Sequence, residues 1–494
     1  MQLRNMESLR PWGMNSVPGF DTNEYRWLDE AVDGLDLGPP NPSIAAGTGP
    51  CLVVRSQSAD GVSDDALCQL ISTWMSAGDV IHPSFCKTLF IVTGTGSTQP
   101  LSSSFTVQRK SLEDFPGLQA MSVMSITQLL IGSDEHAVNN LCSGPYVWSG
   151  TCFHRIYRSY ADSQSAFFSS IIHIPEDGRF IETRPTSHVA VPSRLYSPPR
   201  AQDRPLSGLR FAVKDLIDVA GLRTSAGSRD YYKYVAESAS SAQLITHLIS
   251  LGAVLIGKTK NTQFANGEDP QEWIDYTCPW NPRGDGYQNP DTSSSGSATA
   301  ISSYDWIDFT IGTDTCGSIA CPAAAQGVFA IRLSTGAASQ EGVLRMNKYL
   351  DSVGLFTRHI DVLSNITSLW LRPDDRLYQT TVQPWSPVDI VYPWSSFSHG
   401  NKETLEAHER FVQSLLSFTG ATRRDLDLDR EWKRIDPLTS ASSVYEDLKK
   451  TTGYLHLAGF SDRVEPFRLA FKEEYGREPY LDKVNLSKLQ VELT

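Results

Sequence analysis

The sequence predicts an α/β fold, preceded by a smaller α+β domain. Three observations support this prediction. The chain has 494 residues, which is more than one simple domain usually contains. Residues 208–258 alternate between apolar strand, amphipathic helix and apolar strand at a spacing typical of parallel pairing. Residues 51–181 instead mix helical and strand-like patterns without this regular alternation.

Composition excludes several classes of protein. The formal net charge is −13 and the isoelectric point is about 5.3, which argues against nucleic acid or an anionic membrane surface as partner. The eight cysteines include no CxxC pair, so a zinc ribbon or a thioredoxin-type motif is not expected. No signal peptide or run of about 18 apolar residues is visible, so we expect a cytoplasmic protein without a membrane span.

The sequence of the N-terminal third predicts a poorly ordered segment followed by a folded domain. Residues 1–49 are rich in Gly, Pro, Asn and Asp and show no sustained period, so we expect a poorly ordered segment. Residues 50–181 are expected to form the α+β domain, with an amphipathic helix at 65–75. Four histidines of this region share no motif or spacing, which favours ordinary packed or surface positions over a second active site. They are His82, His136, His154 and His173.

The end of this domain predicts a hairpin followed by a linker. Residues 167–174 and 179–183 have strand character and are joined by Pro-Glu-Asp-Gly, which is a good turn sequence. Residues 182–205 hold several prolines among polar residues and no apolar period. They predict a proline-rich linker, where we place the domain boundary.

The second domain is expected to cover residues 206–494. A strand at 208–215 ends in Lys214, a helix follows at 241–251, and a short buried strand at 254–256 is closed by Gly-Lys. Further amphipathic helices are predicted at residues 402–418 and 444–459.

Residues 291–332 are unusually rich in small side chains. They hold two serine-rich turns, at 293–297 and 313–318, separated by a predicted helix (297–303) and a predicted strand (306–311). Small residues allow the backbone to come close to another group. If the two turns meet, they form a pocket lined by hydroxyls and backbone N–H groups, which is the outline of an acyl-transfer site.

A serine hydroxyl needs a base to take its proton, and no histidine lies in the small-residue segment. The candidate base is Lys214, which can serve only if burial keeps it neutral. Its neighbours Val213, Leu216 and Ile217 make burial plausible, and Asp215 points the other way along a strand. The alternative is a strand-end lysine whose ammonium reaches solvent.

A set of short motifs occurs in a fixed order across residues 205–361. Together they resemble the amidase signature family of serine hydrolases. The resemblance implies a fold with a central mixed β-sheet flanked by helices, and an amidase signature domain that is C-terminally incomplete in this chain. The motifs are Ala212-Val213-Lys214-Asp215, Gly257-Lys258-Thr259, Cys278-Pro279-Trp280-Asn281-Pro282, Ser293-Ser294-Ser295-Gly296-Ser297, Gly312-Thr313-Asp314-Thr315, Gly317-Ser318-Ile319, Pro322-Ala323-Ala324, and Asp351-Ser352-Val353-Gly354 followed by Arg358.

The resemblance also implies a Ser–Ser–Lys mechanism without metal or cofactor. Ser318 would be the nucleophile, and Ser293, held by a cis peptide, would relay its proton to neutral Lys214. The partner would be a small-molecule amide, hydrolysed to a carboxylate through an acyl-enzyme. Aryl amides such as indoleacetamide, fatty amides and small aliphatic amides all remain open. The oxyanion hole would be built from the backbone N–H groups of Thr315, Cys316, Gly317 and Ser318.

Several residues depart from the family pattern. Members usually carry glycine at the positions of Asp291, Thr292 and Cys316, and side chains there are expected to crowd the two turns. Many members carry an arginine near Ala320, and its absence argues against a small anionic substrate bound in that way. These departures leave open an alternative, in which the fold persists as a catalytically degenerate binding module.

The segment before the second domain suggests a third possibility. With Val191-Pro192-Ser193-Arg194-Leu195-Tyr196 at its exit, it resembles the extension on a fungal group of amidase-like proteins that is described as scytalone dehydratase-like. That resemblance would imply a lyase that uses histidine and carboxylate groups. No arrangement of residues in 51–181 supports such a site, and likeness of name alone is a poor warrant.

Overall fold

Contacts within the chain divide it into two units in the computed structural model. The first is Met1–Trp370 with Pro466–Ser487, and the second is Leu371–Glu465 with Lys488–Thr494. The described residues are 15–17, 24–27, 34–36, 48–56, 64–77, 80–94, 105–110, 127–130, 141–149, 152–175, 177–183, 187–371, 389–393 and 401–490.

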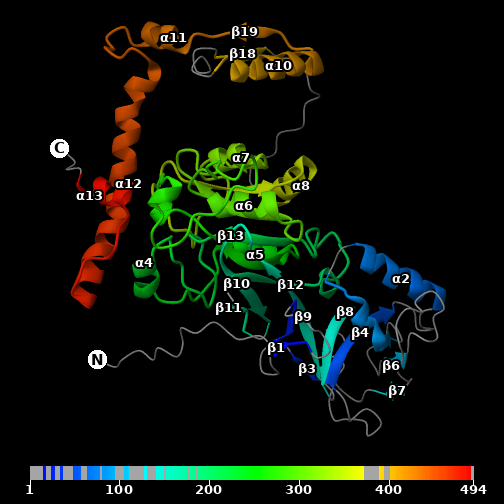
Figure 1. Cartoon of the computed structure of the whole chain (residues 1–494). Helices are drawn as coiled ribbons and strands as arrows, with labels where there is room; N and C mark the ends of the chain where they lie inside the picture. Colours follow the sequence, from blue (N-terminus) through cyan, green and yellow to red (C-terminus); the bar gives the residue numbers. More distant parts are fainter. Residues whose placement is uncertain are drawn as a thin grey trace. The chain divides into compact units, whose positions relative to one another are not determined.

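The first unit contains a ten-stranded, largely antiparallel sheet near the N-terminus (blue to cyan in Figure 1). Its main path runs β1-β2-β9-β8-β4-β5-β6-β7, and β3 and β12 also pair with β9. The bounds are β1 Asn15–Ser16, β2 Tyr25–Trp27, β3 Gly34–Asp36, β4 Thr48–Ser56, β5 Leu89–Gly94, β6 Phe105–Lys110, β7 Thr127–Leu130, β8 Gly144–Ser149, β9 Cys152–Ala161 and β12 His188–Pro192.

Helix α2 (Asp64–Ser76) confirms the amphipathic helix predicted at 65–75. Its apolar residues Leu67 and Ile71 are buried with Leu52 and Val54 of β4, so the helix covers one face of the sheet. A short 3₁₀ helix, η2 (Pro83–Lys87), adds Phe85 to this core. Of the segment predicted to be poorly ordered, the described part forms β1, β2, β3 and the start of β4, and the rest lies outside the described residues.

A seven-stranded mixed sheet forms the centre of the unit, in the order β11-β10-β14-β13-β15-β17-β16. Strand β13 (Arg210–Lys214) pairs in parallel with both β14 (Val254–Thr259) and β15 (Phe309–Asp314), while β17 is antiparallel to β15. The predicted strand–helix–strand unit is confirmed, with α5 (Gln243–Ser250) between β13 and β14. The other strands are β10 Phe167–Ile174, β11 Arg179–Glu182, β16 Phe329–Arg332 and β17 Ser352–Thr357.

The two sheets do not divide at the predicted linker. The predicted hairpin is present, since β10 pairs with β11, but β10 also pairs with β14 and so belongs to the second sheet. Inside the predicted linker, β12 forms a five-residue ladder with β9 of the first sheet. The chain therefore crosses between the sheets three times, from β9 to β10, from β11 to β12 and from β12 to β13. Because β12 is short and lies near several prolines, the local sequence pattern did not predict a strand there.

Helix α6 (Ser295–Ser303) covers one face of the central sheet, against β13, β14, β15 and β17 (Figure 1). Its close approach depends on Gly296, where a Cβ would collide with the Ala166 carbonyl and the backbone of Lys260. The remaining helices of the first unit are α4 Arg229–Tyr234, α7 Ala320–Gln326, α8 Ile360–Trp370, α13 Lys483–Gln490, η5 Arg194–Tyr196, η6 Gln263–Ala265 and η7 Pro270–Glu272, with the last residues of α13 in the second unit.

The second unit is mainly helical, as predicted for residues 402–418 and 444–459. Helix α10 (Lys402–Thr419) begins at an Asn401 cap and ends at Gly420. Helix α12 (Val444–Tyr475) is longer than predicted, and its residues from Pro466 on belong to the first unit. The other elements are α11 Leu428–Ile435 and the parallel pair β18 Ile390–Tyr392 and β19 Arg423–Asp425. Within the described ranges, no helix has the length and apolar character needed to cross a membrane.

Candidate active site

Three sequence motifs meet at one edge of the central sheet. The parallel strands β13 and β15 end side by side, so Lys214 and Asp314 reach the same edge. The turn before α6 lies against the loop after β15, because the Ser294 amide donates to the Ser318 carbonyl at 3.2 Å. This edge, at the carboxyl ends of the parallel strands, is where ligands bind in many α/β sheets. The two serine-rich turns therefore meet as predicted from their small residues.

Lys214 is the buried centre of this arrangement. Its side chain is 0% exposed. The Nζ atom donates to Ser293 Oγ at 2.7 Å and to the Thr313 carbonyl at 3.3 Å. The alternative of a strand-end lysine that reaches solvent is therefore wrong, because the turn before α6 covers the end of β13.

Burial changes the protonation of this lysine. Removal from water lowers the pKa of Lys214 from 10.5 to about 7, against the opposing effect of the Asp314 and Asp351 charges. Desolvation penalises the ammonium form. A large fraction of Lys214 is therefore the neutral amine near pH 7, which is the form that can accept a proton.

The two serines lie in different surroundings. Ser293 is 1% exposed, and the Thr292–Ser293 peptide is cis, as the resemblance implies. Ser318 is half-buried at the end of the loop after β15. Between these two described side chains there is no hydrogen bond, and Ser318 is tied to the serine turn through its carbonyl. Lys214 and Ser293 are thus joined directly, and Ser318 is brought to the same edge by the backbone.

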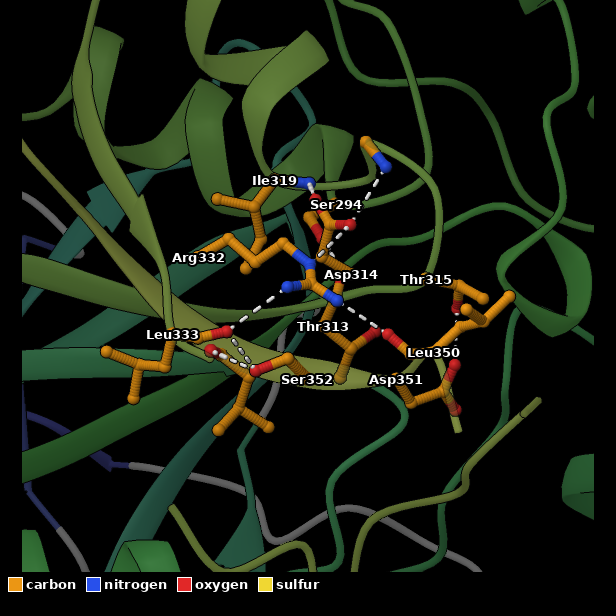
Figure 2. Close-up of polar contacts among 12 residues, drawn as sticks. Ser294, Thr313, Asp314, Thr315, Ile319, Arg332, Leu333, Leu350, Asp351 and Ser352 are labelled. Atoms are coloured by element: carbon orange, nitrogen blue, oxygen red, sulfur yellow. Dashed lines mark hydrogen bonds and ion pairs between the residues drawn. The ribbon is translucent and has the colours of Figure 1, made fainter. Parts of the chain in front are cut away.

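Asp314 shapes the loop that carries Ser318, and Figure 2 shows the contacts of Asp314 with Ile319 and Arg332. Its carboxylate accepts hydrogen bonds from the backbone amides of Gly317 at 2.8 Å and Ile319 at 2.7 Å, and it pairs with Arg332 at 3.2 Å. The side chain is 1% exposed. The Gly317 amide already donates to Asp314 and is not available to a substrate oxyanion. It therefore does not fit the predicted set of four oxyanion donors. Gly317 adopts a φ of 113°, which favours glycine.

Asp351 fixes the other side of the same loop. One carboxylate oxygen accepts from the Thr315 hydroxyl at 2.6 Å, and the other accepts from the amides of Met346 at 2.6 Å and Asn347 at 2.9 Å. Arg332, which pairs with Asp314, also donates to the backbone carbonyl of Leu350, the residue before Asp351, at 2.6 Å (Figure 2). The sequence motifs contained Asp314 and Asp351, but a linear pattern gave no sign of what they bind.

The non-glycine residues of the turns are accommodated without the expected crowding. Asp291 has a φ of 61°, a conformation that Asp tolerates better than most residues. Its side chain accepts from the Thr292 amide at 2.7 Å, which ties down the turn. Thr292 is half-buried, and Cys316 is exposed and so leaves the interior of the loop free.

A buried ion pair on the opposite face of the sheet was missed. Lys258 Nζ lies 2.5 Å from Asp215, and the two side chains are 0% and 1% exposed. Lys258 also donates to the Arg223 carbonyl and the Thr224 hydroxyl, each at 3.2 Å. Ser225 donates its amide to Asp215 at 3.1 Å. Successive side chains of a strand point to opposite faces of the sheet. Lys214 therefore lies on one face, and Asp215, with its partner Lys258, lies on the other.

The histidines of the N-terminal region have separate surroundings. His82 accepts from the Ser84 amide at 3.2 Å, His154 packs beside Trp27, and His173 packs beside Phe180. His136 lies outside the described residues. No group of three or more His, Cys, Asp or Glu side chains in the described part of the chain is placed to hold a metal ion.

Comparison with known proteins finds a match to the Amidase family model over residues 190–455. Amidase 1 of Oryza sativa subsp. japonica is 39% identical over 225 residues, which are 44% of this chain and 50% of that protein. A second protein named Amidase 1, from Arabidopsis thaliana, is 34% identical over 253 residues, or 50% of this chain and 54% of the relative. The chain spans about half the length of these curated relatives.

Two solved structures also align with part of the chain. A crystal structure of an amidase aligns with 26% identity and a TM-score of 0.45, over 59% of this chain and 60% of that chain. A peptide amidase in complex with the inhibitor chymostatin aligns with 21% identity and a TM-score of 0.44, over 58% and 62% of the two chains.

Proposed function

Because the chain belongs to the amidase family, we propose that it hydrolyses the C–N bond of a carboxamide through an acyl-enzyme on Ser318. The observation that carries the proposal is the buried Lys214, which lies 2.7 Å from Ser293 Oγ and whose pKa burial lowers to about 7. A lysine that is neutral near pH 7 can act as a general base, and a base within hydrogen-bond reach of a serine is the arrangement that activates it.

In the proposed first half-reaction, Ser318 Oγ attacks the carbonyl carbon of the substrate. Its proton passes to Ser293 as the Ser293 proton passes to neutral Lys214. The C–N bond of the tetrahedral intermediate then breaks, and the leaving nitrogen receives a proton back along the same path. In the second half-reaction, water attacks the ester on Ser318, and the products are a carboxylate and ammonia or an amine.

The negative charge of the intermediate needs donors that are already in place. We assign this role to the backbone amides of Thr315, Cys316 and Ser318, and leave out the Gly317 amide, which Asp314 occupies. Asp314 and Asp351 act as positioning residues, since they bind the loop from both sides. Fixed donors of this kind contribute about 3–4 kcal/mol each to transition-state stabilisation in other hydrolases.

The substrate is proposed to be a small-molecule amide whose acyl part carries no anionic group near α7. Ala320, at the start of α7, is exposed and stands near the position where many family members carry an arginine. The name Amidase 1 for the rice relative agrees with amide hydrolysis. Aryl, fatty and small aliphatic amides are all consistent with this site.

The test is ammonia release from a panel of aryl, fatty and short aliphatic primary amides. We expect Ser318→Ala, Ser293→Ala and Lys214→Ala each to reduce turnover by at least about a thousandfold. Ser302→Ala is the matched control, because it removes a hydroxyl of α6 that donates to the Thr299 carbonyl and to Gln326 and contacts none of the three proposed catalytic residues. It should leave the rate within about twofold. A Ser318→Ala or Lys214→Ala variant within a few-fold of wild type would show that the mechanism is wrong.

A further inference from the structure

A cavity of about 170 Å³ lies where the two sheets of the first unit meet. The first sheet contributes β9 and β12, the second contributes β10, β11 and β14, and the end of α5 closes it. These strands lie side by side because β12 packs against β9, β10 and β14 (Figure 1). Ligand sites occur preferentially at such junctions between structural layers.

The walls of the cavity are mostly apolar. Ile171 and Ile172 of β10, Ile249 of α5 and Ile256 of β14 form much of the lining, and Phe180 adds an aromatic ring. An apolar cavity of about 150 Å³ in another protein is large enough to hold benzene. This cavity therefore has room for one ring or one short branched chain.

The polar side chains of the lining are Arg155, Tyr157, His173, Ser193, Tyr196 and Ser197. Arg155 of β9 supplies a guanidinium, whose central carbon lies 5.5 Å from the centre of the Tyr196 ring. The described residues of the lining include no carboxylate. The Tyr196 hydroxyl donates to the Pro145 carbonyl and accepts from the Ile156 amide, and the Ser193 hydroxyl accepts from the Leu195 amide at 3.2 Å. The cavity thus offers a mostly apolar space beside the Arg155 guanidinium.

The cavity is separate from the proposed active site. It is lined by the start of β14, whereas Lys214 pairs with Thr259 at the other end of that strand. From Val254 to Thr259 the strand rises about 16 Å, at roughly 3.3 Å per residue. A molecule in this cavity could not also be the amide attacked by Ser318.

We propose that this cavity is a binding site for a small organic carboxylate with one apolar ring or short branched chain. The carboxylate lies against Arg155, and the apolar part fills the space between the isoleucines. Arg is suited to this role because its planar fork matches a carboxylate. Apolar walls and a single guanidinium favour such a monoanion over a phosphate ester. Because both sheets line the cavity, the ligand stabilises their junction by mass action.

The test is a titration of the full-length Ser318→Ala variant, which lacks the proposed nucleophile and so cannot turn benzamide into benzoate. The protein carries ¹³C-labelled isoleucine δ1-methyl groups and is titrated with benzoate and with its neutral isostere benzamide. Methyl signals are assigned by Ile→Val substitutions. We expect benzoate to shift the methyls of Ile171, Ile172, Ile249 and Ile256. The methyl of Ile319, next to Ser318, is the internal control for binding at the proposed active site. Benzamide should bind the cavity about tenfold more weakly, because it lacks the charge.

Two variants examine the role of the cation. Arg155→Gln should weaken benzoate binding about tenfold while leaving benzamide unchanged, and Arg155→Lys should retain part of the preference for benzoate. The comparison of the two ligands in the protein that keeps Arg155 tests the proposal even if an Arg155 variant fails to fold. Shifts confined to Ile319, equal affinities for benzoate and benzamide, or no shift of the four cavity methyls at about 10 mM benzoate would each overturn the proposal.

Discussion

Replacing Lys214 with methionine tests the neutral-lysine assignment through stability as well as activity. Methionine has a similar length and cannot ionise. In the unfolded chain the lysine has its ordinary pKa of 10.5, and in the folded chain burial lowers the pKa to about 7. Between these values the unfolded state binds more protons than the folded state. The free energy of unfolding of the wild type therefore rises with pH from about 7 to about 10.5. The free-energy penalty for burying Lys214 is largest at and below pH 7.

The magnitude follows from the size of the pKa difference. At 1.36 kcal/mol per unit, the penalty at pH 7 is about 4 kcal/mol, and at pH 9.5 it falls to about 1.4 kcal/mol. The methionine variant removes this penalty but loses the hydrogen bonds to Ser293 and Thr313, at about 1 kcal/mol each. We therefore expect Lys214→Met to be about 2 kcal/mol more stable than wild type at pH 7 and about equal at pH 9.5, although catalytically inactive.

The measurement is urea-induced unfolding followed by tryptophan fluorescence at both pH values. Wild type should gain about 3 kcal/mol between pH 7 and 9.5, and the variant should lack this gain. If Lys214→Met is instead less stable than wild type at pH 7 and shows the same pH dependence, the lysine is charged in the folded protein. That result would refute its assignment as the general base.

Further predictions concern the rate and the buried charges. The kcat/KM for amide hydrolysis should rise about tenfold per pH unit below 7 and level off above it, as Lys214 loses its proton; a profile centred near pH 10 would contradict this. Asp314→Ala should lower kcat by about 10²–10³ with little change in KM, because the loop amides lose their anchor; initial rates over a range of substrate concentrations check this. Asp215→Ala should cost about 3–5 kcal/mol in a urea titration, because Lys258 is left buried and unpaired. The double variant with Lys258→Met should recover part of that loss.

Much of the central fold could be predicted from local pattern. The β13–α5–β14 unit follows from short apolar strands on either side of an amphipathic helix, and such units pair in parallel. The β10–β11 hairpin follows from its Pro-Glu-Asp-Gly turn. The meeting of the two serine turns follows from their small residues, because only small residues allow the backbones to approach closely.

The remaining features depend on partners far away in the sequence. Whether β10 pairs with the first or the second sheet is decided by β14, and no local pattern encodes that choice. The short strand β12 lies among prolines, so its signal was too weak to separate it from a linker. Lys258 and Asp215 are each ordinary in sequence, and only the register between β13 and β14 brings them together. The Gly317 amide is a different case, because its partner Asp314 is only three residues away, and the fold of the loop decides that the two groups meet.

The most direct test of the central claim is labelling of the protein with a fluorophosphonate probe, followed by peptide mapping to locate the adduct. The account predicts one adduct, on Ser318, that is lost in Ser318→Ala and reduced at least about a hundredfold in Lys214→Ala. The Ser302→Ala variant should label like wild type. A folded wild-type protein that remains unlabelled, or an adduct that persists in Ser318→Ala, would contradict the claim that Ser318 is an activated nucleophile.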